Sequence, residues 1–333
     1  MLLAFAAFMR ERYAYVIVSS LIAGIATGIF TSSPGQFSRG FSSPLIVIMI
    51  GAMGFTITFK SLKTAAKDWG AFGFGLALNF LFAPFLCWLL ALLFLKGHPD
   101  FATGMILIGV VPCAGMALVW TGLLKGDVPL TTVINAATMI VAPFLIPLLM
   151  RLFAGAFVVI DVLGMFQTVM LTILSPVIVG IILRELAEPR MEVKKYLPLM
   201  PAISATAAVL IMFMAVNTAV PVVIHNLAAI GPLVASTILV FPILFFAAYL
   251  VGKKFLPRGK NIAVTFSSGM KNLAIALGIA VTSFKGLVMF PVAVGFAFQM
   301  LTAVGFYQFF LKIMPPAPVA GGVTQVKPEG NPK

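Results

Sequence analysis

The stretch FSSGMKNLAIALGIA, residues 266–280, holds a single lysine, Lys271, among small and apolar residues. Residues 261–284 contain no other charged side chain, and a segment of this length and composition can cross a lipid bilayer. Lys271 lies about ten residues from either end of the segment, which is deep for a side chain that would have to extend to the interface. Gly269 precedes it and weakens the helix there. The stretch therefore predicts a membrane span that is interrupted at a buried charge.

The composition assigns the whole chain to the membrane. Of 333 residues, 61% are hydrophobic and 9% charged, whereas a soluble domain has about 25% charged residues. The net charge of +13 does not indicate nucleic-acid binding, because the basic residues gather between apolar segments, where they set orientation. Cys87 and Cys113 lie in apolar segments and do not predict a disulfide framework. The apolar opening precedes Arg10 and Arg12, so we expect an interfacial segment leading into the first span, and not a signal peptide.

Ten segments are long and apolar enough to be spans: 13–30, 43–59, 69–95, 101–124, 128–150, 164–184, 198–218, 228–251, 261–283 and 287–311. With the N-terminus in the cytoplasm, most of the 22 lysines and arginines fall on the cytoplasmic side, as expected for a multi-pass protein of the cell membrane. The opposite side receives Arg39, Lys96, Arg151 and Lys285. Both termini are then cytoplasmic, and the Pro/Gly-rich tail 315–333 is predicted to be disordered.

Two of the spans resemble each other. Residues 109–130 and 266–289 both begin with small residues and a Gly or Pro break, continue as apolar helix and reach a Lys-Gly pair. They are five spans apart, so the two halves of the chain have opposite orientations. Inverted repeats with interrupted helices are typical of secondary transporters, and the interruptions indicate the binding site. Because Gly and Pro are frequent in membrane helices, chance similarity is the alternative, against which the Lys-Gly pairs 125–126 and 285–286 argue.

Both stretches resemble one family. Residues 112–149 and SSGMKNLAIAL, residues 267–277, are similar to the same regions of the bile acid:sodium symporter superfamily. The resemblance implies ten spans arranged as two inverted five-helix repeats, with the broken helices of spans four and nine crossing each other. It also implies transport by alternating access through a cavity between two domains. These are a panel domain, residues 13–59 and 164–218, and a core domain, residues 69–150 and 228–311.

The superfamily's arsenite efflux permeases offer a second resemblance. They carry a Pro-Cys pair in span four, followed by a methionine and LVW, and this chain has Pro112, Cys113, Met116 and LVW at 118–120. Where these permeases have a glutamate before LAIA, this chain has Asn272. Arsenite efflux with Cys113 as a thiolate ligand is therefore an alternative function. The competing interpretation is that a single buried cysteine is a small apolar residue.

The resemblance also allows the family's sodium ligands to be transferred. A Ser-Asn pair in span four matches Ala117 and Leu118, and two hydroxyl residues in span five match Thr131 and Asn135. The last two are equally expected to line a cavity or to bond within the core.

The remaining ligands match one hydroxyl, one amine and one amide side chain. A glutamate in span nine matches Ser267, a glutamine there matches Lys271, and a glutamine in span three matches Asn79. The carboxylate and two of the oxygen ligands are thus missing. We expect the Lys271 ammonium to occupy a sodium position, so that sodium dependence is weakened or absent and a proton on Lys271 replaces it in any coupling.

Two groups of candidate residues follow. The predicted cation or coupling site consists of Lys271, Asn79, Ser267, Ser268 and Met270. The predicted substrate site consists of Pro112, Cys113, Ala114, Gly115, Thr131, Asn135, Gly269 and Asn272. No metal ion or other cofactor is expected in either.

These observations favour a secondary active transporter of a small organic anion, because a buried cation beside a helix break suits a carboxylate. An intramembrane enzyme would need a nucleophile with a base, or metal ligands, at membrane depth; His98 and His225 both lie near loops. A channel would need a ring of polar groups. Asn217 also lies near a predicted outer loop and is expected to face water. The solute's identity and the oligomeric state stay open.

Overall fold

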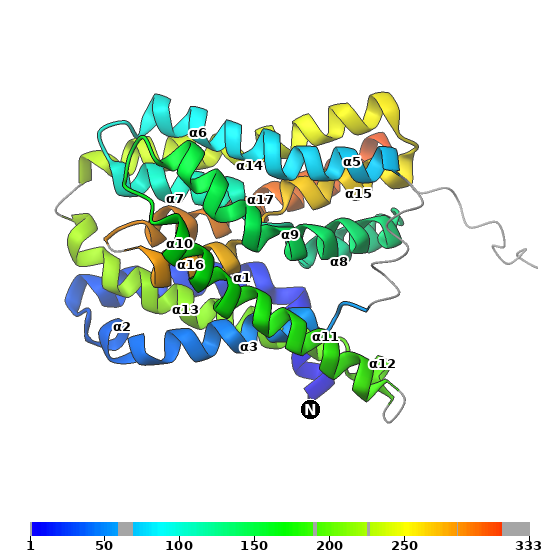
Figure 1. Ribbon diagram of the computed structural model, residues 1–333, viewed down its shortest axis with the longest axis horizontal. Helices are drawn as coiled ribbons and strands as arrows, with labels where there is room; N and C mark the ends of the chain where they lie inside the picture. The colour runs from blue at the N-terminus through cyan, green and yellow to red at the C-terminus, as the bar shows by residue number, and fades with distance from the viewer. Residues whose placement is uncertain (1, 59–68, 189–191, 225–226, 285, 315–333) are drawn as a thin grey trace, which may run out of the picture.

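The structure, a computed structural model, describes residues 2–58, 69–188, 192–224, 227–284 and 286–314 (Figure 1). Within these ranges the regular structure is helical, apart from one isolated bridge between two residues. Six helical segments are long and apolar enough to cross a membrane: Trp69–Phe94, Val128–Ala154, Val162–Ala187, Leu199–Pro221, Ile230–Phe255 and Met289–Ile313. An all-helical integral membrane protein is therefore confirmed. The predicted tail 315–333 and Lys285 lie outside the described residues.

The other four predicted spans contain shorter apolar helices. They are Tyr15–Phe30 within α1 (Leu2–Phe30), α3 (Ser42–Gly54), α7 (Pro99–Val110) and α16 (Leu273–Ser283). α7 and α16 are short because each is half of an interrupted segment. α7 is followed by α8 (Met116–Leu123), and α16 is preceded by α15 (Arg258–Gly269).

The start of the chain is helical and continues into the first predicted span. α1 runs without a break from Leu2 to Phe30. Its first turns bury Ala6, Met9 and Tyr13, which follow each other at helical spacing and so share one face. Because this face packs inward, the first turns belong to the helical bundle.

The helices pack in two groups, which Figure 1 shows one above the other. In the lower group, α1 packs along α13 (Leu199–Ile224), and α3 packs against both α13 and α11 (Ser175–Ala187). In the upper group, α14 (Ile230–Phe255) packs along α15, α6 (Ala83–Phe94) packs along α7, and α17 (Met289–Ile313) contacts α14, α16 and α7. The remaining helices include α2 (Ser33–Phe37), α5 (Trp69–Ala77), α9 (Val128–Ala154), α10 (Val162–Val169) and α12 (Val193–Tyr196).

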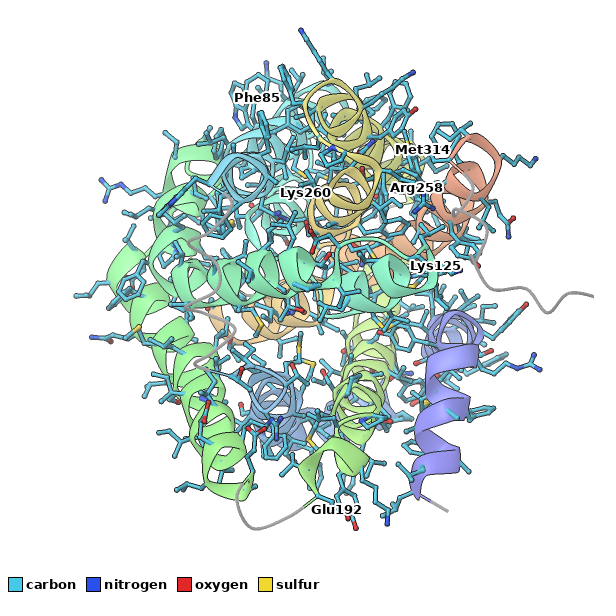
Figure 2. All side chains as sticks on the ribbon, turned by 90° about the vertical axis from the view of Figure 1, so that its right-hand side faces the viewer. Phe85, Lys125, Glu192, Arg258, Lys260 and Met314 are labelled. Carbon is cyan, nitrogen blue, oxygen red and sulfur yellow. The ribbon has the colours of Figure 1, made fainter. Side chains whose placement is uncertain are left out.

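Polar contacts tie the ends of the interrupted segments together. At the end shown in Figure 2, Arg258 at the start of α15 donates from Nη2 to the carbonyl of Leu124 at 3.0 Å and from Nε to that of Met314 at 2.8 Å. The N–H of Asp127 donates to the carbonyl of Gly259 at 2.9 Å. Elsewhere, the N–H of Leu287 donates to Asp100 Oδ2 at 3.0 Å. Each interrupted segment is thus anchored at its start to the turn that follows the other.

Asn217 is buried, so the prediction that it faces water is wrong. Its Oδ1 accepts the N–H of Gly35 at 2.9 Å, and its Nδ2 donates to Thr27 Oγ1 and to the carbonyl of Thr31, both at 3.0 Å. The turn between α1 and α2 lies against α13 and brings backbone groups that the buried Asn217 amide pairs. His225 lies outside the described residues.

The close contact between α3 and α11 depends on Gly180. A Cβ added there would lie 2.3 Å from the Gly51 carbonyl oxygen and 2.7 Å from the Phe55 nitrogen. We expect Gly180→Ala to force the helices apart and lower the free energy of unfolding by about 1–3 kcal/mol. Gly73→Ala is the matched control, because nothing lies within 4 Å of its added Cβ and alanine favours a helix by up to about 1 kcal/mol. Thermal unfolding in detergent measures both; equal effects of the two substitutions would contradict the interpretation.

Candidate functional site

The two interrupted segments cross at their breaks. Residues 111–115 separate α7 from α8, residues 270–272 separate α15 from α16, and Cys113 and Lys271 pair as an antiparallel bridge. The N–H of Ala114 donates to the Met270 carbonyl and the N–H of Asn272 to the Pro112 carbonyl, both at 2.8 Å. Lipid offers no partner for unpaired backbone groups, so each break supplies hydrogen bonds to the other. The predicted breaks and their crossing are confirmed.

Local sequence explains where each break falls. Pro112 disfavours the helical conformation for the residue before it, and Val111 is extended, with φ −71° and ψ 156°. In the second segment, Gly269 lies against the Phe245 ring, and a Cβ there would come within 2.3 Å of a ring carbon. After the break, the Asn272 side chain caps α16 by accepting the N–H of Ile275 at 3.2 Å.

Lys271 is fully buried and its amine is bonded inside the protein. Nζ donates to the backbone oxygen of Asn79 at 3.2 Å and to its Oδ1 at 3.1 Å. The backbone N–H of Lys271 donates to Gln299 Oε1 at 2.8 Å. The alternative in which Lys271 extends to the interface is therefore wrong. Among the described residues, the structure shows no ion pair between this amine and a carboxylate.

A helix defect makes the Asn79 carbonyl available. Residues Leu78–Phe82 form a π-helical turn, in which the N–H of Ala83 bonds to the carbonyl of Leu78. The next bond in this register would join Pro84 to Asn79, but proline has no N–H. The Asn79 carbonyl thus lacks a partner within its own helix, and the Lys271 amine, 192 residues further along the chain, supplies one.

In a second π-helical turn, the carbonyl left unpaired by a proline finds a donor within its own helix. In Met170–Leu174 the N–H of Ser175 bonds to the carbonyl of Met170, and Pro176 follows. Here the freed carbonyl, that of Leu171, accepts the Ser175 hydroxyl at 2.6 Å. Position 83 holds alanine, which has no hydroxyl, so the first turn must take a donor from elsewhere.

The Asn79 side chain extends this network to α15. Its Nδ2 donates to the carbonyls of Gly75 at 2.9 Å and Ser267 at 3.1 Å. Ser267 lies in the last turn of α15, where carbonyls carry partial negative charge that favours a nearby cation. The Ser267 hydroxyl bonds back to the carbonyl of Ala263 at 2.7 Å, whereas the buried Ser268 Oγ has no partner.

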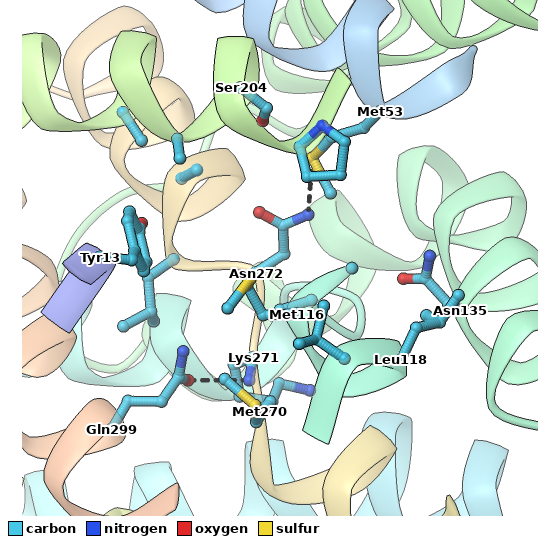
Figure 3. Close-up of a pocket in the computed structure, with 18 of the residues that line it drawn as sticks. Tyr13, Met53, Met116, Leu118, Asn135, Ser204, Met270, Lys271, Asn272 and Gln299 are labelled. Carbon is cyan, nitrogen blue, oxygen red and sulfur yellow. Dashed lines mark hydrogen bonds between the residues drawn. The ribbon is translucent and has the colours of Figure 1, made fainter. Parts of the chain in front are cut away.

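A cavity of about 180 Å³ lies beside the crossing (Figure 3). The crossing itself contributes Ala114, Gly115, Met116 and residues 270–274. Facing them, the lower helix group contributes Tyr13, Met53, Pro201 and Ser204 among others. α8 and α16 both begin at this cavity, so the positive ends of two half-helices border it.

Asn135 is a polar side chain of this cavity with a buried oxygen that lacks a hydrogen bond. It is 4% exposed, and its Oδ1 has no hydrogen-bond partner. A buried amide atom left unpaired costs about 1–3 kcal/mol, which a bound solute or water would recover. Asn272 lies beside Met53, with Nδ2 3.5 Å from the thioether sulfur.

Other predicted residues do not line the cavity. The buried Thr131 hydroxyl bonds to Thr121 Oγ1 and to the Asp127 carbonyl, each at 3.1 Å. Cys113 is fully buried; its N–H donates to Thr138 Oγ1 at 3.3 Å, and its thiol lies 3.4 Å from the Ala114 carbonyl. Within the described ranges no three His, Cys, Asp or Glu side chains gather as metal ligands.

Sequence reasoning missed four residues of the site. Gln299 and Thr138 accept the backbone N–H groups of Lys271 and Cys113 at the crossing. Tyr13 and Met53 line the cavity from the lower helix group. Gln299 is an uncharged polar residue within the tenth predicted span, a signal that could have singled it out. Tyr13 and Met53 carry no such signal.

An apolar helical bundle in which two interrupted helices cross beside a cavity is the architecture of a membrane transporter. Residues 43–226, more than half of the chain, match the Sodium Bile acid symporter family, and the chain belongs to this family. The predicted resemblance is confirmed.

Three similar proteins differ in how much of this chain, and of their own chain, the similarity covers. "Uncharacterized protein YbaS" of Bacillus subtilis (strain 168) is 29% identical over 283 residues, which cover 80% of this chain and 89% of YbaS. "Probable sodium/metabolite cotransporter BASS1, chloroplastic" of Oryza sativa subsp. japonica is 34% identical, over 49% of this chain and 39% of its own. "Arsenical-resistance protein Acr3" of Alkaliphilus metalliredigens (strain QYMF) is 31% identical, over 53% of this chain and 55% of its own. The chain thus spans about half or less of the last two.

The role of Lys271 as the donor to Asn79 can be tested by supplying another. Ala83→Ser places a hydroxyl four residues after Asn79, as Ser175 is placed after Leu171. We expect Ala83→Ser to raise the free energy of unfolding by about 1 kcal/mol in a Lys271→Met chain, and not in the wild type, where the amine already fills the acceptor.

Ser175→Ala is the matched control in the other π-helical turn. It should lower stability by a similar amount whether residue 271 is lysine or methionine. Thermal unfolding in detergent gives all the values. If Ala83→Ser acts equally in both backgrounds, the Lys271 amine is not what satisfies the Asn79 carbonyl.

Proposed function

We propose that this family member is a secondary active transporter that binds a small organic anion in the cavity beside the crossing and moves it by alternating access. The observation that carries the proposal is that α8 and α16 both begin at this cavity. Backbone N–H groups at a helix start favour negative charge. The buried Lys271 adds a positive charge at the crossing.

Polar side chains complete the proposed site. The unpaired amide of Asn135 lies on the cavity wall together with Asn272, Ser204 and Thr56. Because an amide can present either its oxygen or its NH₂ group, Asn135 can donate to a carboxylate or accept from a hydroxyl. The remaining wall is mainly apolar, which suits the hydrocarbon part of a small solute.

We also propose ten spans in two inverted five-helix repeats, with both termini on the cytoplasmic side of the cell membrane. The exchanged contacts support the repeat, since Asp127 bonds to Gly259 at the start of α15 and Leu287 bonds to Asp100 at the start of α7. The turns are not identical, however: Gly286 has a positive φ of 77°, whereas in the first turn Lys125 has a positive φ of 52° and Gly126 does not. The two glycines of the Lys-Gly pairs therefore match in sequence without matching in backbone conformation.

The proposed domains follow the same division. The predicted panel, residues 13–59 and 164–218, contains the helices that pack around α13, and the predicted core, residues 69–150 and 228–311, contains the interrupted segments. The cavity lies between the two sets, with Tyr13, Met53 and Ser204 facing the crossing. Relative movement of the sets would open it to alternate sides. The names of BASS1 and Acr3 describe cotransport and arsenical resistance, and we propose no enzymatic activity.

Lys271 is proposed to replace a bound cation. Its amine contacts two oxygens of Asn79, and the Asn79 amide contacts the last turn of α15. A tethered ammonium would there supply the charge that a sodium ion supplies in a sodium-coupled relative, in a place where this chain has serine and not a carboxylate at position 267. Transport would then not require sodium.

Uptake of radiolabelled small carboxylates into liposomes that contain the purified protein tests both points. We expect saturable uptake whose initial rate is unchanged when potassium replaces sodium. Asn135→Leu should weaken apparent affinity by about tenfold, the equivalent of one lost hydrogen bond to a charged group. Absence of carboxylate uptake would contradict the proposed solute class, and uptake that requires sodium would contradict the role of Lys271. A response to a pH gradient would identify the proton as the coupling ion.

Arsenite efflux is the second candidate, favoured by the similarity to Acr3. The position of Cys113 disfavours a thiolate mechanism, because the buried thiol does not line the cavity. We therefore expect Cys113→Ser to leave arsenite resistance of an expressing strain unchanged, with empty vector as the control. If expression confers resistance and Cys113→Ser abolishes it, the second candidate replaces the first.

A further inference from the structure

A groove on the surface of the upper helix group is lined only by apolar side chains. It has a volume of about 390 Å³ and runs between the third predicted span and α14. Its lining residues are Phe74, Ala77, Leu78, Leu81, Phe82, Phe85, Val251 and Phe255. Figure 1 shows α5, α6 and α14 along the edge of the molecule that is turned away from the lower group. The groove shares no residue with the cavity at the crossing, and it faces the surrounding lipid.

The groove is about as long as one leaflet of a bilayer is thick. From Phe74 to Phe85 a helix rises by about 17 Å, whereas the hydrocarbon core of a bilayer is about 30 Å thick. One end lies where α5 begins, at Trp69, and where α14 ends, at Phe255. There the Phe74 and Phe255 rings stack, with centroids 5.4 Å apart. The groove therefore begins near one membrane interface and ends near the midplane, as a bound acyl chain requires.

Two lysines lie at the interfacial end of the groove. Lys253 and Lys254 belong to the last turn of α14, and both are exposed. The Lys254 Nζ lies over the ring of Phe255, 5.1 Å from its centroid, and the Lys253 Nζ lies 6.0 Å from the centroid of Tyr249. Within the described ranges neither amine forms an ion pair with a carboxylate. Their charge is thus available to an anion outside the chain.

The inner wall of the groove includes the π-helical turn Leu78–Phe82. Leu78, Leu81 and Phe82 line the groove, whereas Asn79 is fully buried and its carbonyl accepts the Lys271 amine. One turn thus contacts the groove on one side and the crossing on the other. An acyl chain in the groove would pack on this turn, so a bound lipid should stabilise the folded protein.

We propose that the groove binds an anionic phospholipid, with one acyl chain between α14 and the π-helical turn and the phosphate beside Lys253 and Lys254. An apolar groove alone accepts the chain of any lipid, so the two lysines supply the selection by head group. A basic residue near an anionic surface contributes about fivefold in affinity, the equivalent of about 1 kcal/mol. The lysines lie on the side that we propose to be cytoplasmic, where anionic lipids are enriched.

Thermal unfolding of the purified full chain in detergent, with lipid titrated into the micelles, tests the proposal. The two probes are phosphatidylglycerol and phosphatidylcholine with the same two oleoyl chains, so that they differ in the net charge of the head group. We expect phosphatidylglycerol to reach its half-maximal effect at a mole fraction about 25-fold lower, since each of two lysines contributes about fivefold. Equal effects of the two lipids would overturn the proposal.

Lys254→Gln tests the head-group contact and should reduce the preference for phosphatidylglycerol by about fivefold. Lys195→Gln is the matched control. Lys195 is an exposed lysine of α12, which Figure 1 shows at the opposite edge of the molecule, and its loss should leave the preference unchanged. If both variants reduce the preference equally, or neither does, the attraction is general to a basic surface and the proposed site is wrong.

Ala77→Phe tests the acyl-chain contact, because Ala77 lines the groove and a phenyl ring there would fill it. The variant should lose the stabilisation by phosphatidylglycerol. Leu93→Phe is the control on the same span, 67% exposed and outside the groove, and should keep it. Stabilisation that persists in Ala77→Phe overturns the site. If Ala77→Phe does not fold, the lysine variants still decide.

Two further outcomes separate this proposal from its alternatives. If the wild type ignores both lipids and is a dimer that Ala77→Phe dissociates, the groove is a contact between two copies of the chain, and the lipid site is overturned. The choice of leaflet rests on the proposed orientation, but the experiment in detergent does not. A negative result there therefore overturns the lipid site and leaves the proposed transport of a small anion intact.

Discussion

A bilayer interior has no water to pair with backbone N–H and C=O groups, and this constraint governs the centre of the structure. Two helices are broken there, at 111–115 and 270–272, and a third is distorted by the π-helical turn at Leu78–Phe82. The backbone groups that each defect leaves unpaired bond to residues at another of the defects. The breaks bond to each other through Ala114 and Asn272, and the carbonyl that Pro84 leaves free accepts the amine of Lys271. The defects are therefore tolerated as a set, and the set fixes where the upper helices meet.

The same arrangement separates the partial charges at the ends of the broken helices. The carbonyl of Ser267 at the end of α15 accepts the Asn79 amide, and the Asn79 carbonyl accepts the Lys271 amine, whereas α8 and α16 begin at the cavity. Helix ends that favour cations and helix ends that favour anions are thus separated at each break. This separation follows from backbone direction alone, since a broken helix necessarily exposes acceptors before the break and donors after it. Side chains such as Asn135 only refine what the backbone has already determined.

Much of this could be predicted from the sequence. Length and apolarity located the six long helices, and Pro112, Gly269 and Lys271 located the breaks, because these residues act through local backbone chemistry. Contacts between segments that are distant in the sequence were harder to predict. Asn217 looked like a loop residue, since nothing in its own segment shows that the α1–α2 turn lies against it. The walls at Tyr13 and Met53 come from packing between helix groups, which one sequence does not encode in any local pattern. Gln299 is an intermediate case. The sequence shows a polar residue within its span, but it does not show which group the side chain bonds.

The covalent attachment of the Lys271 amine to the chain bears on the kinetics of transport. A dissolved ion must be captured before each turnover and released after it, so its concentration on either face of the membrane enters the rate law. An amine fixed by four methylenes to the main chain is present in every carrier molecule, whether or not it holds a proton. If Lys271 replaces the ion, as proposed, the order in which ion and solute associate is no longer a variable, and the cycle reduces to loading, reorientation and discharge of the solute.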